Sequence, residues 1–385
     1  MIRAHFGRKA IAGSSIALFA LLASGCAESA TGQAGGPKDG TTSASPTDSV
    51  AEGWNERLVD APSKPEDLIE LPGTESLIVS GMSADPGNDA GGSGHLYLMG
   101  KSTFELTEIW PERKHAVELD KKLYGDCPAP PSLNVASPHG IGLEEQTDGT
   151  SRLYVVNHGG RESVEVFSLA PSPQGNVDVT WIGCELLPKG TFGNGVAPDP
   201  ASDGFYVTNY FDPSDMMAGF KTAFAGDETG YVLHSTPSQG WEKVRGSEMS
   251  APNGIAVSED GKSIFAAGWG SRDIRKFSVD EPDAAPQVLE LGFMPDNLRW
   301  TASGTLLVTG QDIDSFETFQ GFRSGATAPK PGFQVMEIQP GDFTAKEIAS
   351  GNSAGFTNAT TVIEVNGSLL IGSVDGNKIM ELTKP

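Results

Sequence analysis

Short β-rich runs separated by turn residues dominate the chain from about Trp54 onward, and no long stretch has helical periodicity. The clearest unit begins at Asn253. Its first apolar run leads to the hairpin signal Asp260-Gly261 and a second run, and two further β-rich runs follow near 271–279 and 286–291. Four antiparallel strands in succession are typical of one blade of a β-propeller.

The same succession recurs along the chain, with units that begin near Glu66, His139, Asn194, Asn253, Asn297 and Thr360. Six units in roughly 330 residues match the propeller repeat of about 40–50 residues, lengthened by insertions. A closed ring of blades also removes exposed sheet edges. The pattern therefore predicts an all-β fold, a single six-bladed β-propeller with four-stranded antiparallel blades over residues 54–385.

The first 25 residues have the texture of a secretory signal peptide. Three basic residues precede the apolar run 16–22, which is too short to span a bilayer and is followed by small residues. The run ends in Leu22-Ala-Ser-Gly-Cys26, which resembles the lipobox of bacterial lipoproteins. We therefore expect Cys26 to carry a lipid that anchors the protein in the bacterial cell envelope, at the periplasm or outer membrane. A plain signal peptide with an incidental cysteine is the alternative.

Residues 26–53 are rich in Gly, Ser, Thr, Ala and Pro and are expected to form a flexible tether. Without residues 1–25, which carry three basic and no acidic residues, the chain has 24 basic and 50 acidic residues and a net charge of −26. Such an electrostatic field disfavours nucleic acid as a partner and attracts cations.

In an oxidising compartment Cys127 and Cys184 are expected to form a disulfide, with two buried thiols as the alternative.

Oxygen-bearing side chains recur at one phase of the repeat. The first strand of each unit is expected to be innermost, so the residue just before it would lie at the mouth of the central tunnel. In the second unit this position holds His139. In the other units with a polar side chain of this kind it holds the residues that we call the ring: Glu66, Asn194, Asn253, Asp296 and Asn297. Each residue alone would fit a turn or a cap. Together, two carboxylates and three amides suit calcium better than magnesium, and the Cys and His ligands of a zinc site are lacking. The sequence therefore predicts a calcium ion in the tunnel.

Two histidines belong to the second unit. His139 occupies the ring position, and His158 ends the second strand, so the two side chains are expected to face each other across one blade. Imidazole titrates near neutral pH, which makes the pair a candidate for acid–base chemistry beside the predicted ion.

Several ordered motifs carry a family resemblance: Glu66-Asp-Leu, Ser137-Pro-His-Gly-Ile, Tyr154-Val-Val-Asn-His, Phe205-Tyr-Val-Thr-Asn, Ala251-Pro-Asn-Gly-Ile and Asp296-Asn. With these motifs the chain resembles the paraoxonase/arylesterase branch of the calcium-dependent six-bladed propellers, a superfamily that includes gluconolactonase. The resemblance covers about Pro65 to Leu382. It implies a catalytic calcium on the ring residues and a dyad of His139 and His158.

The resemblance also implies a second, structural calcium on the carboxylate of Asp67 and the carbonyl of Ile141. Gly195 stands where the family has a further Asp ligand, so the sequence supports one ion and leaves the second open. The ring-closing disulfide of animal paraoxonases has no counterpart here, and Cys127 and Cys184 would link neighbouring blades.

The implied activity is hydrolysis of a small-molecule lactone or ester, with calcium polarising the carbonyl and His139 accepting a proton from water while His158 orients it or relays the proton. Asp296 is the alternative base.

The segment 210–224 is expected to be either an acyl-chain wall or a surface loop on blade three. A sugar lactonase and a non-catalytic, calcium-stabilised binding protein are the alternative functions, and the two histidine motifs favour the paraoxonase side.

Overall fold

The computed structural model describes residues 49–50, 53–83, 92–172, 176–323 and 330–385. The expected signal peptide (1–25), lipidated Cys26 and nearly all of the expected tether (26–53) lie outside these ranges.

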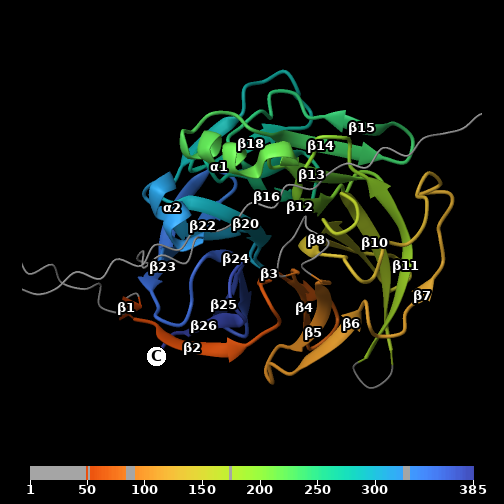
Figure 1. Ribbon diagram of the computed structural model, residues 1–385, viewed down its shortest axis with the longest axis horizontal. Coiled ribbons are helices and arrows are strands. Elements are labelled where there is room, and N and C mark those ends of the chain that lie inside the picture. The colour runs from red at the N-terminus through yellow and green to blue at the C-terminus, as the bar shows by residue number, and fades with distance from the viewer. Residues whose placement is uncertain (1–48, 51–52, 84–91, 173–175, 324–329) are drawn as a thin grey trace, which may run out of the picture. The chain divides into compact units, whose positions relative to one another are not determined.

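Six antiparallel sheets surround a central axis, which confirms the predicted six-bladed propeller (Figure 1). Blade one contains β3 (Pro65–Leu71), β4 (Ser76–Gly81), β5 (His95–Gly100) and β6 (Leu106–Trp110). Blade two contains β8 (Pro138–Glu145), β9 (Ser151–Asn157), β10 (Ser163–Pro171) and β11 (Val177–Leu186), with the short β7 (Ala116–Val117) parallel to β11. Blade three contains β12 (Gly193–Pro198), β13 (Phe205–Asn209), β14 (Tyr231–Thr236) and β15 (Gly240–Lys243).

The remaining blades follow the same order. Blade four contains β16 (Pro252–Val257), β17 (Ser263–Gly268), β18 (Asp273–Ser278) and β19 (Gln287–Glu290). Blade five contains β20 (Met294–Trp300), β21 (Leu306–Asp312), β22 (Gly332–Gln339) and β23 (Thr344–Asn352), and β1 (Ser49–Val50) adds to β23. Blade six contains β24 (Ala359–Val365), β25 (Ser368–Ser373), β26 (Lys378–Thr383) and β2 (Asn55–Asp60). The predicted Asp260-Gly261 hairpin joins β16 to β17, and Gly261 has the positive φ of +70° that such a turn favours.

The ring closes through blade six. Its outermost strand, β2, comes from the beginning of the propeller and pairs antiparallel with the last strand, β26, so that Leu58 lies opposite Met380 (Figure 1). The repeat pattern placed the first unit at Glu66 and did not predict β2, because this short strand lacks a hairpin partner next to it in sequence.

In the described part of the chain two α-helices interrupt the strands, and they contact each other. α1 (Met216–Phe224) lies in the β13–β14 connection and begins where the Asp215 carboxylate accepts a hydrogen bond from the Ala218 amide at 3.0 Å. α2 (Phe316–Arg323) lies in the β21–β22 connection. Among the described residues, neither of these helices nor any other is long and apolar enough to cross a membrane.

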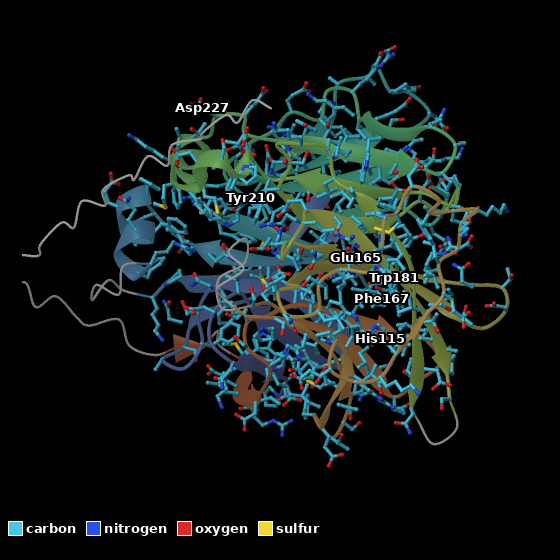
Figure 2. All side chains as sticks on the ribbon, turned by 45° about the vertical axis from the view of Figure 1, so that its right-hand side comes forward. His115, Glu165, Phe167, Trp181, Tyr210 and Asp227 are labelled. Carbon is cyan, nitrogen blue, oxygen red and sulfur yellow. A yellow bond between two sulfur atoms is a disulfide. The ribbon has the colours of Figure 1, made fainter. Side chains whose placement is uncertain are left out.

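A disulfide joins Cys127 and Cys184, with a Cα–Cα distance of 5.2 Å, and Figure 2 shows it as a yellow bond. The predicted pairing is confirmed. The expectation that it links neighbouring blades is wrong, because Cys184 is in β11 and Cys127 is in the segment between β7 and β8, which leads into the same blade. Further along this blade Glu165 and Trp181 lie side by side, joined by a 2.9 Å hydrogen bond from the indole to the carboxylate (Figure 2).

Candidate active site

Every innermost strand carries a bulge at the position that the repeat phase singled out. The register shifts fall between Pro65 and Asp67, Pro138 and Ile141, Gly193 and Val196, Pro252 and Ile255, Pro295 and Leu298, and Ala359 and Val362. A bulge leaves one residue unpaired and re-aims its side chain. The ring residues therefore lie inside their strands, at the bulges, and not just before the strands as the sequence pattern suggested.

Glycines after two ring asparagines allow the inner strands to approach each other. A Cβ added at Gly195 would lie 2.8 Å from the carbonyl oxygen of Asn253, and one added at Gly254 would lie 2.5 Å from the Cα of Asn297. The Asn-Gly pairs thus serve close packing of successive blades around the tunnel and form no hairpin turn.

Four ring residues each bury an oxygen that has no hydrogen-bond partner in the described part of the chain: Glu66 Oε2, Asn194 Oδ1, Asn253 Oδ1 and Asp296 Oδ1. All four residues line the same cavity, together with His139. An unpaired buried oxygen costs free energy, and four of them on one cavity form a donor set that a hard cation satisfies. Asn297 stands apart, since it does not line the cavity and its amide donates to Glu66 Oε1 at 2.8 Å.

The charges of this ring need compensation. Burial, followed by the nearby Glu66 carboxylate, raises the pKa of Asp296 well above its ordinary value, and a hydrogen bond from Gln311 at 2.9 Å opposes the shift. Among the described residues no three His, Cys, Asp or Glu side chains form a group that could hold a metal. A metal ion in the ring would therefore depend on amide oxygens for part of its donor set, as calcium sites do and zinc sites do not.

The structure brings His139 and His158 into direct contact. His139 Nδ1 lies 2.7 Å from His158 Nε2, and His139 Nε2 lies 3.6 Å from Glu66 Oε1 at the edge of the ring. His139 belongs to β8, and His158 directly follows β9, the neighbouring strand. The sequence did not identify Glu162, whose Oε2 lies 2.9 Å from His158 Nδ1.

The donors expected to hold a second ion are already engaged. The guanidinium of Arg299 donates to the Asp67 carboxylate, to the Ile141 carbonyl at 3.0 Å and to the Leu68 carbonyl at 2.8 Å. The Ile141 amide also donates to Asp67 Oδ2 at 2.9 Å. Burial raises the pKa of Asp67, and the charge of Arg299 counteracts that rise. With a cation bound to both donors, and with no room for a Cβ at Gly195, these residues do not fit a second calcium.

Opposite the ring, the cavity of about 370 Å³ has an apolar wall. From the segment 210–224 this wall takes Tyr210, Met216 and Phe220, whereas Met217 is exposed. These three residues lie where the wall interpretation requires, and whether they contact an acyl chain stays a prediction. Other wall residues that the sequence did not reveal are Phe192, Trp269, Ile313, Phe319 and Phe322. Tyr210, labelled in Figure 2, is buried, and this burial raises the pKa of its hydroxyl well above the ordinary value.

Two further polar residues connect the wall, the ring and the sixth blade. Gln311 accepts from the Trp269 indole at 2.6 Å and donates to Asp296, so it orients a wall residue and a ring residue together. Thr360 lies at the bulge of the sixth inner strand and donates to the Glu66 carbonyl at 2.6 Å. The repeat phase contained the signal for Thr360, because it heads the sixth unit, whereas nothing in the sequence pointed to Gln311.

Comparison with known proteins identifies the family of this chain. The sequence profile of the family described as Arylesterase matches residues 57–379. The chain is 30% identical over 320 residues to "Serum paraoxonase/lactonase 3" of Mus musculus and 26% identical over 321 residues to the Homo sapiens protein of that name, in each case over 80% of this chain and 83% of the relative. Among solved structures, a luciferin-regenerating enzyme has the same fold with a TM-score of 0.50 and 11% identity, over 86% of this chain and 95% of that one. The chain belongs to the arylesterase (paraoxonase) family of lactone and ester hydrolases.

Proposed function

We propose that the protein is a calcium-dependent hydrolase of lactones or related esters, with the ring as its metal site and His139 as its base. The observation that carries this proposal is the junction of two features in one cavity. Four unpaired buried oxygens lie there, and the Nε2 atom of His139 lies at their edge, 3.6 Å from Glu66. Family membership supplies the class of reaction, and the site supplies the residues.

The ring fits one calcium ion, held by Glu66, Asn194, Asn253 and Asp296, with Asn297 either as a further ligand or as the residue that orients Glu66. When bound, the ion would polarise the carbonyl of the substrate and stabilise the negative charge that develops on its oxygen. We propose no second ion, because Arg299 supplies the positive charge at Asp67 and Ile141.

The protein's own residues carry the proton. In this mechanism His139 accepts a proton at Nε2 from the attacking water, and its Nδ1 stays hydrogen-bonded to His158. The apolar wall excludes water from the rest of the cavity and holds the hydrocarbon part of the substrate. Because that wall consists of aromatic and aliphatic side chains, an acyl or aryl substituent fits it better than a sugar.

Asp296 is the competing base. One of its oxygens accepts from Gln311 and the other faces the cavity unpaired. The two assignments differ for the His139→Gln variant, which keeps the ring intact. Loss of about 10²–10⁴ in kcat, the usual contribution of a general base, supports His139. Full turnover by this variant would move the base to Asp296.

The test of the proposed function is turnover of a panel of lactones and aryl esters by the pure protein. We expect hydrolysis to stop in a calcium chelator and to return with Ca²⁺ but not with Mg²⁺ alone. Full activity in the chelator contradicts the metal site. Calcium-dependent thermal stabilisation without turnover of any substrate contradicts the enzyme and favours a non-catalytic binding propeller.

Lipidation of Cys26 is a separate proposal about the envelope. If Cys26 is lipidated, we expect the full-length protein to partition with bacterial membranes and the Cys26→Ala variant to be released in soluble form. Equal partitioning of both proteins would contradict the anchor.

A further inference from the structure

Glu162 stands at the outer end of a line of groups that begins at the ring. Its Oε2 lies 2.9 Å from His158 Nδ1, and His158 Nε2 lies 2.7 Å from His139 Nδ1. The His158 side chain is fully buried, and the Glu162 side chain is 23% exposed. The line therefore runs from the cavity, through a buried imidazole, to a carboxylate in contact with solvent.

The carboxylate decides where the protons of both imidazoles lie. A carboxylate accepts hydrogen bonds and donates none, so His158 Nδ1 must carry the proton that it shares with Glu162. His158 Nε2 then presents a lone pair, to which His139 Nδ1 donates. His139 Nε2 is left with a lone pair directed toward the ring, which is the form that a base requires.

Other contacts of His158 fix the position of its imidazole but not its tautomer. The imidazole stacks on Phe192 with a centroid distance of 4.1 Å and an interplanar angle of 8°, and Phe192 stacks on Phe211. The backbone amide of His158 donates to the Ser137 carbonyl at 3.2 Å. Stacking holds the plane of the ring whichever nitrogen is protonated, so the choice between tautomers falls to Glu162.

We propose that Glu162 is a positioning residue that sets the tautomers of His158 and His139 and stabilises the positive charge of the dyad after His139 takes a proton. This inference rests on the proposed function. In proton terms, the attacking water gives a proton to His139 Nε2, and the charge is shared along the 2.7 Å contact with His158, whose Nδ1–H remains bonded to Glu162. Removing the carboxylate weakens the base without touching the ring.

The test compares Glu162→Gln and Glu162→Ala with the matched control Glu144→Gln. Glu144 lies in the same blade, near the C-terminal end of β8. Its side chain is 27% exposed and pairs with Arg152 at 3.5 Å. The amide that Glu162→Gln introduces can donate to His158 Nδ1 and so favours the opposite tautomer. We expect kcat of this variant to fall about 10²–10⁴-fold, with KM and calcium affinity near those of the wild type. Glu144→Gln should keep kcat within about twofold, as a substitution away from the dyad.

Two readouts exclude a merely structural role. Formate should restore part of the kcat of Glu162→Ala, because the vacated position is open to solvent, and should not restore Glu162→Gln. The ¹⁵N chemical shifts of His158 should report the Nδ1–H tautomer in the wild-type protein and a different state in Glu162→Gln. If the wild type hydrolyses lactones and Glu162→Gln behaves like Glu144→Gln, the inference is wrong and the proposed function stands. If the wild type hydrolyses nothing, the proposed function fails, and the ¹⁵N shifts still decide whether Glu162 sets the tautomers.

Discussion

The guanidinium of Arg299, in blade five, donates to the carboxylate of Asp67, in blade one, across the tunnel. The Arg299 side chain is 11% exposed and that of Asp67 is 1% exposed. The permanently charged guanidinium thus neutralises a buried carboxylate whose residue directly follows Glu66 of the ring. Two further hydrogen bonds of the Arg299 guanidinium, to the carbonyls of Leu68 and Ile141, join the inner strands of blades one, two and five.

Replacing this arginine should change both stability and the number of bound ions. In Arg299→Met the buried Asp67 loses its partner, and we expect unfolding free energy to fall by about 3–5 kcal/mol. Isothermal titration should give one calcium per wild-type chain. In the variant, calcium should raise the melting temperature more than in the wild type, because Asp67 and the Ile141 carbonyl become available to it.

A control separates this effect from the general cost of breaking a buried pair. Arg275→Met removes the partner of Asp273, whose side chain is 4% exposed, in blade four. It should lower stability and leave the calcium response unchanged. Two calcium ions bound by the wild-type protein would show that Arg299 does not exclude the second ion.

The raised pKa of Asp296 leads us to expect that the stability of the metal-free protein depends on pH. Its folded pKa is raised above the ordinary 3.8, so its contribution to stability is complete below that value and is lost as pH rises toward the folded pKa. In chelator, the stability of wild type relative to Asp296→Asn should fall by about 1.4 kcal/mol for each pH unit within this window. Urea unfolding of both proteins across the pH range measures this difference, and calcium should abolish the loss in the wild type.

Asp199 provides a comparison of opposite sign. Burial acts to raise its pKa, but hydrogen bonds from His234 and Ser202 lower the pKa to about 2. Its contribution is therefore present above pH 3.8 and is lost as pH falls toward 2. The stability of wild type relative to Asp199→Asn should rise with pH between about 2 and 3.8, below the window in which the stability relative to Asp296→Asn falls. A fall in the lower window or a rise in the upper one would contradict the assignment.

The apolar wall should select substrates by their hydrocarbon part. Phe220→Ala removes a ring that lines the cavity, and we expect kcat/KM for long-chain lactones to fall about 10-fold or more, given about 1.5–3 kcal/mol for a buried side chain of this size. Short-chain lactones should be affected much less. Met217→Ala, one position from the wall residue Met216 but exposed, is the control. Equal losses for short and long substrates would place the acyl chain elsewhere.

The disulfide should stabilise blade two without affecting catalysis. Cys127 and Cys184 are 57 residues apart, and opening a loop of this length typically costs about 2–4 kcal/mol. The Cys127→Ser/Cys184→Ser double variant should therefore unfold at lower urea concentration and keep the wild-type kcat. Reductant should lower the stability of the wild type and leave that of the double variant unchanged; equal stability of both proteins under oxidising conditions contradicts the prediction.

The sequence predicted the blades and most of the ring because both repeat. The bulge of each inner strand recurs at the same phase, and the polar residues at the bulges, such as Asn194 and Asn253, are visible as a series. His139 and His158 were identifiable because one blade holds both. Features that occur only once in the chain produce no repeating pattern from which they could be predicted.

Arg299 shows why the remaining features could not be predicted. It is one arginine on a strand, and its partner Asp67 is 232 positions away in the chain, so the pair follows from closure of the ring. Glu162 is close to His158 in sequence but lies in the connection between β9 and β10, where a carboxylate carries no signal of its own. The wall from α2 depends on the contact of α2 with α1, which the separate sequence patterns of the two segments do not contain.

The pairing of β2 with β26 has a consequence for the order of events during synthesis. Glu66 emerges early and Thr360 late, yet Thr360 holds the Glu66 backbone and β26 completes the sheet that contains β2. A nascent or truncated chain that ends before β24 has all the proposed donor residues but no closed circle of blades to hold them. If the ring binds calcium as proposed, capture of the ion requires a chain that has completed blade six, and the metal site would then act as a checkpoint for completed assembly.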